Sequence, residues 1–122
     1  MLLLDTKILV DLLRREQKTV TWLKGTTAKL SVSVISLMEL SAGVRNRREE
    51  ADLVRLEALV RTLVVDRDIA KRAGVFIRLY SASHAIDDAD ALIGATAEHH
   101  GLELVTLNVK HFPMFPRLKP PY

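Results

Sequence analysis

The chain contains no cysteine, and this absence excludes two kinds of site. Without thiols there are no disulfide bonds and no metal sites built from thiolates. A bound metal would therefore be held by oxygen or imidazole ligands. An imidazole site is poorly supported, because no HExxH spacing occurs and His99 and His100 are adjacent, so they would point apart on a helix. We therefore do not expect zinc.

Long apolar runs and glycine-rich turns are also absent. The opening Leu2–Leu4 run is too short for a signal peptide, and Asp5 interrupts it. No segment approaches the roughly 20 apolar residues that span a bilayer. We therefore expect a cytoplasmic protein without membrane segments. The turn Asp5-Thr6-Lys7 lacks the glycines of a dinucleotide-binding domain, and Lys7 stands where an aspartyl phosphatase needs a second acid.

The composition indicates one globular domain with a mildly basic surface. The 122 residues are 48% hydrophobic, which supplies a core for a single domain over residues 1–122. Residues 1–72 carry 14 Lys and Arg against 10 Asp and Glu, whereas residues 73–122 carry 4 and 5. A basic surface with local acidic islands suits a polyanion approached through metal ions. An ordinary solvated surface would have the same charge.

Short apolar runs alternate with helical patterns along the chain. The runs predict strands over residues 2–4, 30–34, 63–65 and 102–106. Apolar spacing predicts helices with candidate caps at Thr6, at Ser36, at Asp66 or Asp68, and at Asp88. These helices cover residues 8–13, 19–24, 37–44, 53–63, 69–80 and 89–100, with Gly101 ending the last; residues 45–48 and 81–88 are predicted turns or loops.

This alternation predicts an α/β fold, a three-layer α/β/α sandwich around a central parallel sheet of four to five strands. The tail over residues 111–122 holds all four prolines and is predicted to be irregular, with at most one edge strand. Ligands of such sheets bind at the carboxyl ends of the strands. Residues that follow strands are therefore the candidates for a functional site.

Acidic residues recur at these positions. Asp5 follows the first predicted strand, and Glu39 lies just inside the helix after the second. Asp90 lies in the first turn of the helix that precedes the fourth strand, with Asp87 and Asp88 just before it. Separate segments would thus deliver carboxylates into one cleft.

Carboxylates this close repel one another, and a divalent cation removes the conflict. Oxygen ligands without thiolates favour Mg²⁺ or Mn²⁺. Two such ions about 3.5–4 Å apart can activate a water and stabilise the leaving oxygen of a phosphodiester, and one ion can do part of this. The pattern therefore predicts metal-dependent hydrolysis of a phosphodiester.

Each residue also has an ordinary structural interpretation. Asp5 and Asp88 could be helix caps, Asp87 a loop residue, and Asp90 a first-turn acid favoured by the helix dipole. Glu39 is harder to explain in this way, because its apolar neighbourhood makes an unpaired acid costly. Only the joint placement of the acids favours a functional site.

Three motifs together resemble the PIN-domain ribonucleases, and most closely the VapC-type toxins of toxin–antitoxin pairs. They are LLLDTKILVDLL at 2–13, SVISLMELSAGV at 33–44 and DADALIGATAEHHGLELVTLNVKHF at 88–112, in that order over nearly the whole chain. The resemblance implies a PIN-like fold and a metal-dependent endoribonuclease. It also implies a homodimer, and inhibition by a VapB-type antitoxin that covers the acidic cleft.

The resemblance places the catalytic metal ligands on Asp5, Glu39 and Asp90, with Mg²⁺ or Mn²⁺ as cofactor. It also implies pocket roles for Thr6 and Thr106. Many PIN domains have a further acid where this chain has Asn108, so a second metal would bind more weakly here. Asn108 could equally be a turn residue, and Asp88 could supply part of the missing charge.

Contacts with RNA are less well marked. Arg45 and Arg47 form a basic turn after the Glu39 helix, and His111 lies near the expected pocket, so these three are candidates for RNA contacts. Solvated surface is the ordinary interpretation of the two arginines. The alternative function is a non-catalytic PIN-like module that binds RNA or a protein without cutting.

Overall fold

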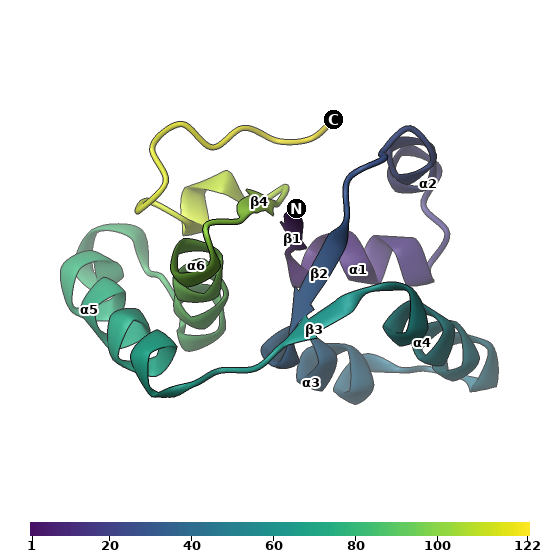
Figure 1. The fold of residues 1–122 in the computed structure, drawn as a ribbon, viewed down its shortest axis with the longest axis horizontal. Helices are drawn as coiled ribbons and strands as arrows, with labels where there is room; N and C mark the ends of the chain where they lie inside the picture. Colours follow the sequence, from purple (N-terminus) through teal and green to yellow (C-terminus); the bar gives the residue numbers. More distant parts are fainter.

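The computed structural model describes all of residues 1–122 and is built on a four-stranded parallel sheet (Figure 1). The predicted α/β class and parallel sheet are confirmed. The strands are β1 (Leu2–Leu4), β2 (Leu30–Ser33), β3 (Arg61–Leu63) and β4 (Glu103–Val105), in the spatial order β3-β2-β1-β4. The helices are α1 (Thr6–Leu13), α2 (Gln17–Lys24), α3 (Val34–Gly43), α4 (Arg47–Leu59), α5 (Arg67–His84) and α6 (Asp88–His100), with a short 3₁₀ helix, η1 (Val109–His111).

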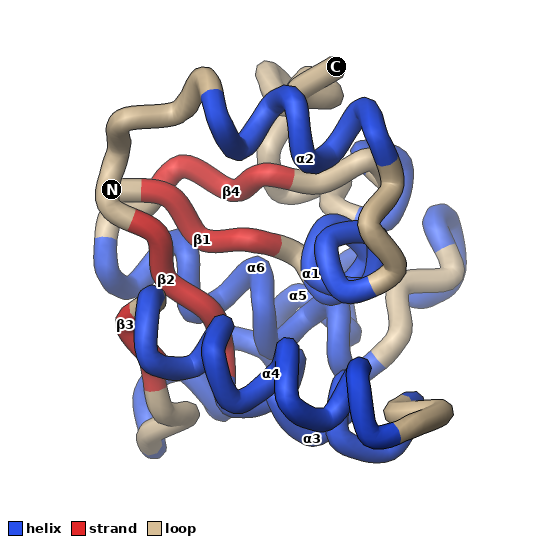
Figure 2. Tube along the Cα trace, turned by 90° about the vertical axis from the view of Figure 1, so that its right-hand side faces the viewer, coloured by secondary structure: helices blue, strands red, loops and turns tan.

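Both faces of the sheet are covered, as Figure 2 shows with α1 and α4 in front of the strands and α5 and α6 behind. Alternate residues of each strand enter opposite faces. Leu4, Val32 and Val105 pack with residues of α1, α3 and α4. Leu3, Leu63 and Leu104 pack instead with α6 and the fully buried Phe112. None of the helices has the length and apolar character needed to cross a bilayer.

Three helices begin one to three residues earlier than predicted, because a different side chain forms each cap. Asp5, not Thr6, caps α1 and accepts a hydrogen bond from the Thr6 amide. Ser33, not Ser36, caps α3, so β2 passes into the helix without a loop. Asp87, not Asp88, caps α6. In each case a capping side chain at the strand or loop end outweighs the apolar pattern that suggested a later start.

Other boundaries also differ from the predictions. β3 covers Arg61–Leu63 rather than residues 63–65. It is an edge strand, and an edge strand can include polar residues such as the exposed Arg61 and Thr62. Half of the predicted basic turn belongs to α4, which Asn46 caps. α5 continues to His84 through residues predicted as a loop, and ends at Ala85 with a φ of 49°. The ends of α6 at Gly101 and of β1 at Asp5 agree with prediction.

The tail is irregular, as predicted, and forms no edge strand. It is nevertheless part of the core. Phe112 is fully buried, and Met114 lies against Gly94 of α6. At the far end, the Tyr122 hydroxyl hydrogen-bonds the buried Thr19 of α2, so the tail crosses from one side of β4 to α2 (Figure 1).

Replacing Phe112 with alanine tests whether the tail stabilises the fold. The Phe112→Ala change should lower the free energy of unfolding by about 3–5 kcal/mol, because it leaves a cavity beneath β4 and α6. The control Leu79→Ala alters a side chain that is 59% exposed and should change that free energy by less than about 0.5 kcal/mol. Urea denaturation measures both; equal small effects would mean that the tail is not part of the core.

Candidate active site

Asp5 lies at the carboxyl end of β1, where the chain turns into α1. Its side chain is buried, and both oxygens accept hydrogen bonds: Oδ1 from the Thr6 amide at 2.8 Å and Oδ2 from the Thr106 hydroxyl at 2.7 Å. No basic side chain forms a salt bridge with it. Asp5 is therefore a helix cap as well as a candidate ligand.

Thr106 follows β4 and reaches Asp5 because β1 and β4 are neighbours, with Leu4 opposite Val105. Its hydroxyl accepts a hydrogen bond from the Asn108 amide at 2.9 Å and donates to Asp5. Thr106 is fully buried. Asn108 is exposed and uses its backbone here, which agrees with its interpretation as a turn residue.

Asp90 lies in the first turn of α6, beside the Asp87 that caps the helix. The Asp90 amide donates to Asp87 Oδ1 at 2.8 Å. The Asp90 side chain is only 15% exposed, and its Oδ2 lies 3.3 Å from Nδ1 of His111, which comes from η1. The tail thus brings the one basic side chain that contacts these acids.

The pKa values show that these carboxylates crowd one another. Burial and the charges of Asp87 and Asp5 raise the pKa of Asp90 to about 7, against the opposing effect of His111. Burial raises the pKa of Asp5, which hydrogen bonds from Thr106 and the Thr6 amide partly offset. The cluster of Asp5, Asp87 and Asp90, here called the acid cluster, is thus a group of closely spaced carboxylates that has His111 as its one basic neighbour.

Glu39 reaches this region from α3, which contacts both α1 and α6. The side chain is exposed, and its Oε1 accepts a hydrogen bond of 2.7 Å from the Thr6 hydroxyl. Because Thr6 adjoins Asp5, Glu39 is connected to the acid cluster through this hydroxyl rather than by direct contact.

The structure therefore brings the predicted acids to one edge of the sheet without forming a closed metal cage. No group of three or more Asp, Glu and His side chains is arranged to hold a metal ion by itself. The oxygen atoms at this edge belong to carboxylates and hydroxyls. Such ligands suit a hard cation that keeps several of its bound waters.

Other predicted residues have different surroundings. Asp88 is exposed and takes part in no side-chain hydrogen bond or ion pair of the structure. Arg45 donates from its amide, Nε and Nη2 to the buried Glu49, which lowers the pKa of Glu49 to about 2. Arg45 thus has a structural role. Arg47 is exposed and forms no ion pair.

Two residues to which the sequence analysis gave other roles lie next to the predicted site residues. Asp87, predicted to be a loop residue, caps α6 and helps to raise the pKa of Asp90. The three acids within residues 87–90 indicated that one of them caps this helix, but the residue types did not show which one. Ser36, predicted to be a cap, instead lies 2.8 Å from the Thr6 hydroxyl.

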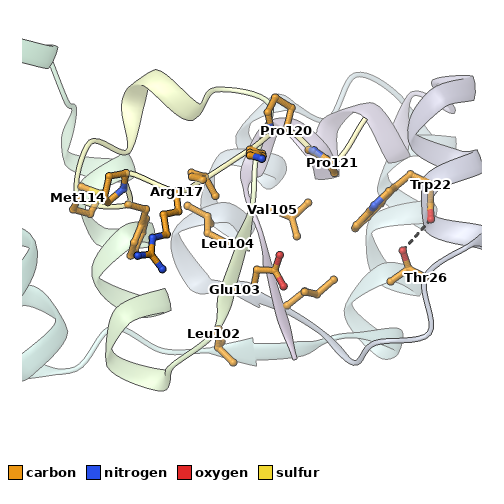
Figure 3. Close-up of a pocket in the computed structure, with 15 residues that line it drawn as sticks. Trp22, Thr26, Leu102, Glu103, Leu104, Val105, Met114, Arg117, Pro120 and Pro121 are labelled. Atoms are coloured by element: carbon orange, nitrogen blue, oxygen red, sulfur yellow. Dashed lines mark hydrogen bonds between the residues drawn. The ribbon is translucent and has the colours of Figure 1, made fainter.

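A hollow of about 700 Å³ lies elsewhere, between β4 and the tail (Figure 3). Trp22 of α2 closes one end and Met114 the other, with Pro120 and Pro121 along the rim (Figure 3). Neither Asp5 nor Asp90 lines it. The acid cluster lies at the carboxyl edge of the sheet and does not line this hollow.

The PIN domain family model matches residues 2–116. The chain belongs to the PIN-domain family. Two similar proteins of Mycobacterium tuberculosis are Ribonuclease VapC19, 43% identical over all of both chains, and Ribonuclease VapC10, 42% identical over all of this chain and 93% of its own. A solved toxin–antitoxin complex from Klebsiella pneumoniae contains a chain with a TM-score of 0.84 and 29% identity, covering 100% of this chain and 98% of its own. The predicted PIN-like fold is therefore confirmed.

Metal-free stability of this PIN domain should depend on pH through Asp90. Its pKa is about 7 in the folded state and about 4 when unfolded, so the folded state retains a proton that the unfolded chain releases between these values. Stability from this group is present below pH 4 and is lost as the pH rises through 7. With a chelator present, the melting temperature of Asp90→Asn minus that of the wild type should increase from pH 5 to pH 7.5. A difference that does not vary with pH would contradict the crowding of the acids.

Proposed function

We propose that this PIN domain is a metal-dependent endoribonuclease and the toxin of a type II toxin–antitoxin pair. The observation that carries the proposal is the meeting of Asp5 and Asp90 at the carboxyl edge of the sheet, with Glu39 linked to them through Thr6. The names of the similar proteins support the same reaction and the same kind of partner. RNA is the substrate class, and hydrolysis of a phosphodiester is the reaction.

The donors present fit Mg²⁺ or Mn²⁺. Asp5 and Asp90 would be the direct ligands, and Glu39 would bind directly or through a water. Mg²⁺ is commonly held by only one or two carboxylates together with waters and substrate phosphates, which matches an open edge. When bound, the ion supplies charge stabilisation and a more acidic water for attack on phosphorus.

The side chains of this chain prepare that site. Thr106 and the Thr6 amide hold both oxygens of Asp5, so its orientation is fixed before a ligand arrives. His111 at Asp90 Oδ2 can pair with that acid when no cation is present, and can turn to a phosphate when one is. Asn108 and Asp88, at the exposed rim, are candidates for contacts to a second ion or to water.

RNA would be bound by basic side chains around this edge. Arg47 has no ion-pair partner and is available for a phosphate contact. Arg45 is already paired with Glu49, so a phosphate would have to bind in addition to that pairing. A VapB-type antitoxin as inhibitor, a homodimer as the assembly and a cytoplasmic location complete the proposal. A non-catalytic RNA- or protein-binding module is the alternative that experiment must separate.

Cleavage of RNA by the purified protein separates the two. With Mg²⁺ or Mn²⁺ the wild type should cut, and Asp5→Asn or Asp90→Asn should lower the rate by at least about 100-fold, the loss expected when a catalytic ion is no longer held. Asp68→Asn is the matched control, because Asp68 is an exposed first-turn acid of α5 outside the acid cluster, and it should retain most activity. Absence of cleavage across varied RNAs, with RNA still bound, would favour the binding module.

Metal binding should also stabilise the fold. Mn²⁺ added at about 100 times its dissociation constant should stabilise the protein by about 2.7 kcal/mol, raising the melting temperature. Asp90→Asn should reduce this rise, while the control Asp68→Asn should not. If Asp90→Asn leaves the rise unchanged, Asp90 is not a ligand.

A further inference from the structure

Ser36 is the third residue of α3, so the residue four positions earlier is Val32 of β2, and the Ser36 hydroxyl is directed to another helix. Thr96, deeper inside α6, instead donates to the Leu92 carbonyl four residues earlier at 2.7 Å, as a buried serine or threonine inside a helix commonly does. Ser36 is fully buried in α3, but its only side-chain partner is the Thr6 hydroxyl of α1, at 2.8 Å. Since Ser33 caps α3, Ser36 has no capping role either.

The direction of the hydrogen bonds follows from counting protons. The Thr6 hydroxyl has one proton, and it donates that proton to Oε1 of Glu39 at 2.7 Å. An ionised carboxylate can only accept. The proton between Thr6 and Ser36 must therefore come from Ser36, which gives a directed chain from Ser36 to Thr6 to Glu39.

This series of hydrogen bonds restricts the side chain of Glu39. Because Glu39 is exposed, its long side chain would otherwise sample several rotamers. The anchor of the chain is Ser36, which is buried and therefore has a fixed position. Removing the Ser36 hydroxyl would leave the Thr6 hydroxyl oxygen without a donor. The rotamer of Thr6 would then be less restricted.

We propose that Ser36 is a positioning residue that fixes the Glu39 carboxylate beside the acid cluster by orienting the Thr6 hydroxyl. Ser36 does not touch a cation or RNA; it acts through Thr6. The inference rests on the proposed function, in which Glu39 is a metal ligand. Its geometric part concerns this chain alone and can be tested without metal.

Side-chain couplings measured by NMR on metal-free protein test the geometric part. In the wild type, Thr6 and Glu39 should each show one dominant χ1 rotamer, and Ser36→Ala should convert both to averaged populations. Thr96→Val is the matched control, because it removes a buried helix hydroxyl whose only side-chain hydrogen bond is to the Leu92 carbonyl of its own helix, and it should leave both rotamers as they are. Unchanged rotamers in Ser36→Ala would overturn the proposal.

Calorimetric titration with Mn²⁺ tests the consequence for binding. Ser36→Ala should weaken Mn²⁺ binding by about tenfold, the lower end of the effect expected when a partner of a metal ligand is lost. Thr96→Val should not weaken it. In a Thr6→Val background Ser36→Ala should cause no further loss, since the two residues act in series. A further tenfold loss in that background would show that Ser36 does not act through Thr6, and would overturn the proposal.

The two proposals fail in distinguishable ways. If wild-type protein neither binds Mn²⁺ nor cleaves RNA, the proposed function fails, and the NMR couplings still decide whether Ser36 orients Thr6 and Glu39. If the wild type binds and cleaves but Ser36→Ala behaves like Thr96→Val, only the role of Ser36 is wrong.

Discussion

Crowding of negative charge at the carboxyl end of β1 is the constraint on which the rest of the site depends. Asp5 is buried between the start of α1 and Thr106, and Asp87 and Asp90 approach it from α6. Hydrogen bonds from Thr106 and the Thr6 amide hold Asp5 without neutralising it. Only His111 offers a basic partner, and it lies in η1, after β4. A divalent cation is the ligand that such a cluster would accept most readily.

The pairing of the strands and the starting points of the helices are enough to create this crowding. Parallel pairing of β1 with β4 places Asp5 and Thr106 at one edge, and direct passage from β2 into α3 starts that helix at the same edge. The caps of α1 and α6 are themselves acids of the cluster, so the residues that begin these helices also supply the charge. Stability and function therefore share side chains here, and a substitution at Asp5 or Asp87 will affect both.

Much of this arrangement could be predicted from the sequence, because it depends on local patterns. Apolar runs located the strands to within two residues, and the rule that ligands bind at strand ends brought Asp5, Glu39 and Asp90 to one edge. The caps were harder, since Asp87 and Asp88 are equally suitable by residue type. The contact between His111 and Asp90, and the hydrogen bonds joining Ser36, Thr6 and Glu39, depend on how the tail and the helices pack. No local pattern encodes those distances.

Whether the acid cluster holds a cation is the central claim, and anomalous diffraction from crystals grown with Mn²⁺ tests it most directly. The account predicts an anomalous peak bonded to carboxylate oxygens of both Asp5 and Asp90, with Glu39 bound directly or through one water. A structure in which Mn²⁺ binds other surface acids, such as Asp66 or Asp52, and leaves this cluster without a peak would contradict it.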